Sequence, residues 1–412
     1  MIQYDSFTLD NGLRVLVHED PYIPTVAMNL LYDVGSRDEH PEKTGFAHLF
    51  EHLMFGGSAH IPQYDEPLQR AGGENNAFTT TDITNYYLVL PAANIEVGFW
   101  LESDRMLALS FEPDVLEVQR KVVIEEYKQR YLNQPYGDAW LRLRPMAYKV
   151  HPYQWATIGK DISHIENATM DDVKAFFYAY YRPNNAILAV AGNVKTEQIK
   201  RLAQKWFEPI PVGNVPARKL PCEPQQTEAR IQHVEANVPV SALYKAWHMC
   251  ERLAPQFYAT DLLNDVLGRG KSSRLYRTLV EERRLLTSVS ASITGSIDSG
   301  LFVISAKPAE NVSLEQAEQA ILEVIAELQT ELLPEEELQK VKNQAETTLI
   351  FSEMEVLNRA MNLAYGALLG NPNLVNEQAE HIQAVSVEDI RQVAQQILHP
   401  NNCSTLYYHA KQ

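Results

Sequence analysis

The stretch DVKAFFYAYYRPNNAILAVAG, residues 172–192, has a counterpart later in the same chain. Residues 389–409, DIRQVAQQILHPNNCSTLYYH, follow the same plan: an aspartate, an amphipathic helical segment, a Pro-Asn-Asn turn and a strand-like run. In both stretches the aspartate precedes the proline by eleven residues. Two units of one plan, placed far apart in a chain, indicate an internal duplication.

Earlier segments recur in the same order. The strand and helix expected at 239–268 match those at 25–54, and residues 299–322 match residues 84–107. Helix-turn-strand units can converge on Pro-Asn turns, but convergence does not explain a conserved order across half a chain. We therefore predict an α+β protein of two homologous domains related by a pseudo-twofold duplication, each a mostly antiparallel sheet packed with helices.

Local patterns agree with this fold class. Alternating apolar residues flank Asp10-Asn11-Gly12, a tight-turn signal that predicts an opening hairpin. Further strands are expected at 25–35 and 84–91, and long helices at 93–109 and 114–132. Strands and helices alternate unevenly, which does not favour regular βαβ winding.

A proline-rich stretch separates the two halves. Residues 208–224 read EPIPVGNVPARKLPCEP and contain five prolines. Such a density cannot continue a helix or a central strand, so we interpret it as a semi-rigid linker. The predicted domains are an N-terminal catalytic domain at 1–208, a linker at 209–224 and a C-terminal duplicated domain without a metal site at 225–412.

Composition limits the classes of function. The 412 residues carry a net charge of −17, which disfavours nucleic acid as a partner because phosphate binding needs a basic face. Three scattered cysteines form neither a C-x-x-C pair nor a disulfide framework, as expected in a reducing compartment. The first twenty residues lack signal-peptide features, and no apolar run reaches about 18 residues, so we expect a cytoplasmic protein without membrane contact.

The segment GFAHLFEHLMFGG, residues 45–57, contains the candidate chemistry. His48, Glu51 and His52 form an H-x-x-E-H motif, and on a helix the spacings i, i+3 and i+4 place all three on one side. Two imidazoles and a carboxylate leave zinc a fourth position for water. Zinc lowers the pKa of such a water to about 7, and a neighbouring carboxylate can take its proton. The same donors also accept manganese or cobalt.

The alternative interpretation is two ordinary helix histidines with an ion-pairing glutamate. The flanking residues argue against it, because the segment is apolar nearly all round and its polar groups therefore need buried partners. A third ligand is expected from another element. The candidates are Glu125 and Glu126, which follow an apolar run on the helix expected at 114–132, and the pattern alone does not choose between them.

The chain resembles the pitrilysin/insulinase family of zinc metallopeptidases, which includes the mitochondrial processing peptidases. The resemblance extends over nearly the whole chain and is carried by these segments: DNGLRV at 10–15, GSRDE and GFAHLFEHLMF within 35–55, GGENNAFTTTDITNYY at 72–87, RKVVIEEYKQR at 120–130, YRPNNAILAVAGN at 181–193 and GRGKSSRLYRTL at 268–279.

The resemblance implies roles for further residues. It selects Glu126 as the third ligand of one zinc ion per chain, beside His48 and His52. Gln119 stands where relatives often have a supporting glutamate, and an amide can still accept a hydrogen bond there without adding charge. Residues 74–79 resemble the family's substrate-binding edge strand, which implies peptide contacts at three residues: Asn76, Ala77 and Phe78.

One departure concerns the second domain. Relatives have an arginine and a tyrosine there that contact the bound peptide, and this chain has Val280 and Thr287 at those positions. The resemblance to half-length members of the family then implies a heterodimer with a homologous chain that supplies the pair. A homodimer would be slower, because losing oxyanion-type stabilisation typically costs about 10²–10³ in rate.

These observations predict a zinc-dependent endopeptidase that hydrolyses peptides or unfolded segments in a closed chamber, with Glu51 as general base. The first alternative is a non-catalytic structural or assembly subunit of the same family, which should show a broken motif. The second is a metal-dependent hydrolase of another substrate class. The three motif residues and the third ligand, Glu126, are all present, which favours the peptidase.

Overall fold

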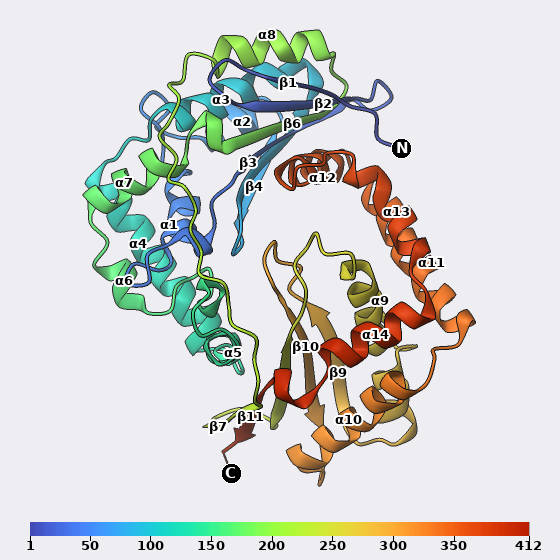
Figure 1. Cartoon of the computed structure of the whole chain (residues 1–412). Helices are drawn as coiled ribbons and strands as arrows, with labels where there is room; N and C mark the ends of the chain where they lie inside the picture. Colours follow the sequence, from blue (N-terminus) through green and yellow to red (C-terminus); the bar gives the residue numbers. More distant parts are fainter. Residues whose placement is uncertain (412) are drawn as a thin grey trace. The chain divides into compact units, whose positions relative to one another are not determined.

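The computed structural model describes residues 1–411, and they form two compact units. The first unit consists of residues 1–128, 155–220 and 350–377. The second consists of residues 129–154, 221–349 and 378–411. Each unit contains one sheet with its own helices (Figure 1).

The sheet of the first unit has six strands in the order β1-β2-β6-β3-β5-β4. Only the β2–β6 pair is parallel, and the other pairs are antiparallel. The strands are β1 Asp5–Thr8, β2 Arg14–Glu19, β3 Thr25–Tyr32, β4 Glu74–Thr79, β5 Thr84–Pro91 and β6 Ala186–Gly192.

The sheet of the second unit has five strands in the order β7-β11-β8-β10-β9. Its one parallel pair is β7–β11, so it repeats the first sheet strand for strand apart from β1. The strands are β7 Arg230–Ala236, β8 Ala242–His248, β9 Leu286–Ile293, β10 Leu301–Pro308 and β11 Cys403–Ala410. The predicted α+β fold with a duplicated domain is confirmed.

The helices occupy the segments between these strands. They are α1 Phe46–Leu53, α2 Asp65–Arg70, α3 Ile95–Leu107, α4 Pro113–Tyr127, α5 Ala139–Ala147, α6 Ile162–Glu166, α7 Met170–Tyr180, α8 Thr196–Trp206, α9 Phe257–Gly268, α10 Leu314–Thr330, α11 Glu335–Ser352, α12 Val356–Leu368, α13 Leu374–Ala384 and α14 Val387–Ile397. A π-helical turn, Lys128–Leu132, continues directly from α4.

The repeated stretches fold alike for a local reason. The helices α7 and α14 both begin with a capping box, formed by Thr169 and Asp172 in one and by Ser386 and Asp389 in the other. Such boxes satisfy the first N–H groups of a helix. A short 3₁₀ turn over Pro-Asn-Asn then leads into an interior strand of each sheet, β6 or β11. The aspartate and the turn therefore mark the two ends of each helix.

Each sheet is covered by a helix from the other half of the sequence. The helix α12, from the C-terminal half, packs on the first sheet, where Leu363 and Ala364 lie in one apolar cluster with Leu16 and Leu31. The helix α5, from the N-terminal half, packs on β8 and β11 of the second sheet, and its Leu143 lies in a cluster there.

This exchange of α5 and α12 between the two halves of the sequence differs from the predicted domains, which were residues 1–208 and 225–412. The predicted linker contains the unit boundary between Leu220 and Pro221, and residues 211–227 form neither helix nor strand. However, residues 129–154 belong to the second unit and residues 350–377 to the first. An amphipathic pattern shows that a helix has an apolar face, but it does not show which sheet that face covers.

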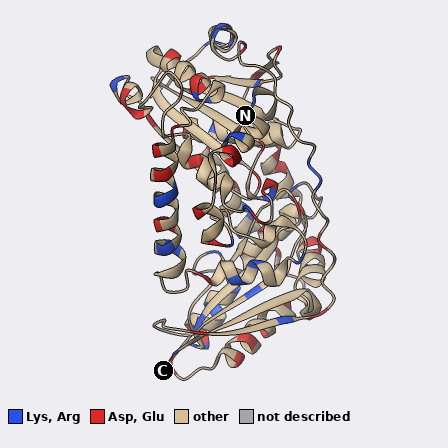
Figure 2. Cartoon of the chain, turned by 90° about the vertical axis from the view of Figure 1, so that its left-hand side faces the viewer, with Lys and Arg blue, Asp and Glu red and all other residues tan. Residues whose placement is uncertain are grey.

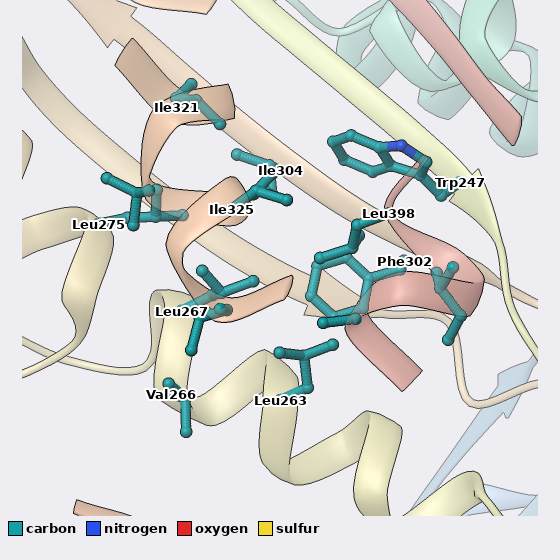
Figure 3. Packing of buried hydrophobic residues seen from close by; sticks show 14 of the residues in the cluster. Trp247, Leu263, Val266, Leu267, Leu275, Phe302, Ile304, Ile321, Ile325 and Leu398 are labelled. Carbon is teal, nitrogen blue, oxygen red and sulfur yellow. The ribbon is translucent and has the colours of Figure 1, made fainter. Parts of the chain in front are cut away.

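The largest core cluster of the second unit lies between its sheet and its helices (Figure 3). The cluster contains Phe302 and Trp247 of the sheet, Leu263 and Leu267 of α9, and Ile321 and Ile325 of α10. Figure 2 shows acidic and basic residues interspersed along the helices on the side that faces the viewer, with no continuous basic stretch. Within residues 1–411, no helix has the length and hydropathy needed to cross a membrane.

Candidate metal centre

The helix that carries the H-x-x-E-H motif has a defined start. Gly45 precedes α1 with φ of +89°, a conformation that other residues rarely adopt. A Cβ atom at Gly45 would lie 2.7 Å from the carbonyl oxygen of Ile158, so the position also requires close approach. Glycine has no side chain to cap the helix. The buried carboxyl group of Glu39 does so instead, accepting hydrogen bonds from the N–H groups of Gly45 at 2.9 Å and Ala47 at 2.8 Å.

Apolar residues fix the rotation of α1. Phe46, Ala47, Leu49, Phe50 and Leu53 are buried. The ring of Phe50 packs against Phe176, Phe177 and Tyr181. Since these residues occupy the core side of the helix, His48, Glu51 and His52 lie on its less buried side, as the sequence pattern predicts.

The predicted metal ligands lie together. The Nε2 atom of His48 lies 3.6 Å from Oε2 of Glu126, and Nε2 of His52 lies 3.3 Å from the same oxygen. The side chains are 12%, 24% and 18% exposed for His48, His52 and Glu126. One ligand atom from each lies within 4.8 Å of the other two, and no other group of three His, Cys, Asp or Glu residues does so within residues 1–411.

The structure distinguishes the two candidate glutamates. Glu126 points from α4 towards the histidines of α1, and the two helices pack beside each other. The buried residues of α4 are Leu116, Val123 and Tyr127. Glu125 is 60% exposed and pairs with Lys128 at 2.7 Å. Consecutive helical residues lie about 100° apart, so only one of them can face α1.

Glu51 has a partner that the sequence analysis missed. The Oγ1 atom of Thr79 donates a hydrogen bond to Oε2 of Glu51 at 2.6 Å. Thr79 is the last residue of β4, and α1 contacts β4 (Figure 1). The run Thr79-Thr80-Thr81 offers three hydroxyls at the end of β4. No feature of the sequence shows that the first of them contacts Glu51.

The predicted substrate-binding residues lie on a free edge. Among the strands of residues 1–411, β4 is the terminal strand of its sheet and pairs only with β5. Asn76 is exposed, Phe78 is 37% exposed and Ala77 is half-buried. The N–H group of Ala77 donates to Oδ1 of its neighbour Asn76 at 2.8 Å. An edge strand of this kind can accept another extended chain.

The remaining predicted positions lie elsewhere in the two units. Gln119 is half-buried on α4, seven residues before Glu126 and so on nearly the same face. In the second unit, Val280 is partly buried against the core cluster. Thr287 is exposed on β9, and its hydroxyl donates to the carbonyl oxygen of Lys307 at 3.3 Å.

The donor set suits zinc. Ligand atoms at about 2.0–2.2 Å from a tetrahedral zinc ion lie about 3.3–3.6 Å from one another. The two measured Nε2–Oε2 distances, 3.6 and 3.3 Å, match that spacing. Two imidazole nitrogens and one carboxylate oxygen are also the donors found in zinc sites that keep an open position.

Known proteins resemble the chain over nearly its whole length. A family model described as Insulinase (Peptidase family M16) matches residues 14–151, and one described as Peptidase M16 inactive domain matches residues 167–345. The zinc protease PqqE of Helicobacter pylori is 30% identical over 98% of this chain and 92% of its own length. A Bacillus subtilis protein named uncharacterized zinc protease YmxG is 27% identical over 95% of each chain.

A solved structure of a protease from Helicobacter pylori matches the fold with a TM-score of 0.94 at 28% identity, covering 99% of this chain and 100% of the other. Sequence, site geometry and fold therefore agree, and the chain belongs to the insulinase family, peptidase family M16.

Proposed function

We propose that the protein is a zinc-dependent endopeptidase that hydrolyses peptides or unfolded segments. The observation that carries the proposal is the convergence of His48, His52 and Glu126 within 4.8 Å, with the Glu51 carboxylate on the same helix. Relatives named zinc proteases support it. His48, His52 and Glu126 would hold one zinc ion.

Glu51 would do the proton transfer. Bound zinc would polarise the scissile carbonyl and lower the pKa of a water molecule. Glu51 accepts a proton as the water oxygen bonds to the carbonyl carbon, and returns it to the amine nitrogen as the C–N bond breaks. General acid–base catalysis of this kind contributes about 10²–10⁴ in rate.

The edge strand β4 would orient the substrate. A peptide added antiparallel or parallel to β4 would exchange backbone hydrogen bonds with it, and the exposed Asn76 and Phe78 would contact its side chains. A peptide carbonyl would replace Asn76 Oδ1 as the acceptor for the Ala77 N–H. Backbone recognition explains why a substrate must be extended or unfolded.

The proposal includes a partner. Val280 and Thr287 cannot donate the charge-assisted hydrogen bonds of an arginine or the phenolic hydroxyl of a tyrosine. We propose that a homologous half-length chain supplies that pair in a cytoplasmic heterodimer, and that the substrate is enclosed in a chamber. The homodimer is the alternative assembly.

The test combines metal analysis with a peptidase assay. Purified protein is expected to bind one zinc ion per chain and to cleave a quenched-fluorescent peptide faster when it is mixed with a half-length homologue from its own genome. Glu51→Gln should lower kcat about 10²–10⁴-fold while zinc content stays at that of the wild type. Full activity of the chain alone would refute the partner, and zinc binding without any cleavage would refute the peptidase.

A non-catalytic assembly subunit is the second candidate. The match of residues 167–345 to a model described as an inactive domain favours it. That match excludes residues 48–126, where the motif lies. The two candidates differ in the assay above, because an assembly subunit would bind a partner chain and show no cleavage that depends on Glu51.

A further inference from the structure

The side chain of Thr79 joins two elements with different tasks in the proposed peptidase. Its hydroxyl donates to Glu51 Oε2 at 2.6 Å. Glu51 lies on α1 with the metal ligands, and Thr79 is the last residue of β4, the strand to which a peptide would add. When Glu51 is ionised, as a general base must be, the contact is a charge-assisted O–H···O hydrogen bond, which is about twice as strong as a bond between neutral groups.

The turn after β4 does not need this hydroxyl. The side chain of Thr80 stabilises the turn. Its Oγ1 accepts hydrogen bonds from the N–H groups of Asp82 at 3.1 Å and Ile83 at 3.0 Å, and donates one to the carbonyl oxygen of Ile83 at 3.3 Å. The Thr79 side chain is half-buried, and its hydroxyl contacts Glu51 of α1. The Thr79 hydroxyl therefore donates to Glu51 and does not stabilise the turn.

We propose that Thr79 is a positioning residue for the proton transfer by Glu51. Its hydroxyl holds one carboxylate oxygen of Glu51 in place, so that the rotation of the carboxylate is restricted before the substrate binds. Because Thr79 ends β4, a peptide that orders this edge strand also orders the base. The inference rests on the proposed function and deepens it.

The kinetic test uses two substitutions that differ in one group. Thr79→Val keeps the β-branched shape and removes the hydroxyl, and Thr79→Ser keeps the hydroxyl. We expect Thr79→Val to lower kcat on the order of tenfold, less than the loss of the base itself. KM should change less than about twofold, since the hydroxyl contacts the base and not the peptide. Thr79→Ser should recover most of the kcat, and zinc content should be the same in all three proteins.

A second test does not depend on activity. The midpoints of thermal unfolding of the zinc-free protein are measured for Thr79→Val, Glu51→Ala and the double variant. If the two side chains interact, the double variant unfolds at a higher temperature than the sum of the two single shifts predicts. Thr79→Val combined with Glu125→Ala is the control, and its shifts should add, because Glu125 faces solvent.

The outcomes separate this inference from the proposed function. Non-additive unfolding together with a loss of kcat that serine restores would support the role of Thr79. Additive unfolding, or equal kcat in Thr79→Val and wild type, would overturn it while leaving the peptidase intact. A wild-type protein that binds zinc and cleaves no peptide would overturn both the peptidase and the catalytic role of Thr79, even if the unfolding shifts were coupled.

Discussion

The two adjacent glutamates at the end of α4 show how strongly one helical step decides chemistry. Glu126 lies 3.3 Å from His52, whereas Glu125 pairs with Lys128 at the surface. The two residues have the same charge and the same local helix propensity. Only the direction of the side chain separates a candidate metal ligand from a solvent-exposed ion pair, which is worth little to stability.

This pair supplies a matched test of the metal site. We expect Glu126→Gln to lower zinc affinity by more than about 100-fold, because changes to groups that merely support metal ligands already cost about 10–100-fold. Glu125→Gln should leave the affinity within about twofold. Competition with a chromophoric chelator measures both, and equal affinities for the two variants would show that Glu126 does not bind the metal.

Spacing on a helix explains which parts of the site were predictable. The i, i+3 and i+4 spacing of His48, Glu51 and His52 in the sequence places all three side chains on one face of a helix. The choice between Glu125 and Glu126 needed the family resemblance. The sequence does not show which side of their helix faces α1, so it does not show which of the two side chains points towards the histidines. Glu39 was missed because it caps α1 from eight residues before Ala47, outside the usual N-cap position. Thr79 was missed because it reaches Glu51 from a separate strand, and such a contact has no signature in a single sequence.

The start of α1 depends on one buried acid. Burial raises the pKa of Glu39 well above its ordinary value of 4.5, while its hydrogen bonds from Ala47 and Gly45 act in the opposite direction. A raised pKa in the folded state means that the native protein holds a proton that the unfolded chain has lost. The stabilising contribution is therefore complete below about pH 4.5 and is lost as the pH rises through the folded-state pKa.

Urea unfolding of the zinc-free protein at several pH values tests this cap. Near pH 4.5, Glu39→Gln should be less stable than wild type by about 1–3 kcal/mol, because the amide cannot accept from both backbone N–H groups. The difference should narrow as the pH rises, since only the wild type loses stability there. Glu42→Gln, at an exposed position of the same loop, is the control and should show a constant difference.

The open edge of β4 leads to a separate prediction about which backbone N–H groups of a peptide substrate are needed for binding. If peptides add to its open edge, a single N-methyl group on the substrate backbone should raise KM about tenfold or more at those positions where the peptide N–H donates to β4. N-methylation at the ends of a long peptide should have no effect. Uniform tolerance of N-methyl groups along the whole peptide would exclude backbone pairing with β4.

The exchange of α5 and α12 affects the stability of each half. Without α12, the first sheet would expose Leu16, Ala27, Leu31 and Ile187, all of which are buried in the described chain. Burial of an aliphatic side chain contributes about 1.5–3 kcal/mol relative to its exposure. Either half of the sequence alone therefore lacks part of its own core.

Fragments provide the measurement. Residues 1–220 alone should bind a hydrophobic dye and unfold without a cooperative transition. The same fragment with residues 350–377 attached through a flexible linker should regain a cooperative transition, because α12 can then cover the sheet. A version of that fusion with Leu363→Asp is the control that keeps the length and removes the packing. Cooperative unfolding of residues 1–220 alone would contradict the expectation.

The duplicated fold was predictable, and the exchange was not. The Pro-Asn-Asn turns, their distance from an aspartate and the order of the strands are local signals, and the capping boxes and strands appear where those signals lie. The strand predicted at 84–91 has those bounds, and the strand predicted at 25–35 ends three residues early, at Tyr32. The packing partner of α12 depends on shape complementarity with a sheet more than 150 residues away along the chain, which the pattern of its own residues does not encode.

The exchange of α12 also sets an order of events during synthesis. The last strand of the first sheet, β6, ends at Gly192, and α12 begins at Val356. At about 5–20 residues per second, a ribosome needs roughly 10–30 s to make the intervening chain. For that interval the nascent first sheet has an uncovered apolar face, so the N-terminal half is a natural client for a chaperone that shields emerging chains until the second half arrives.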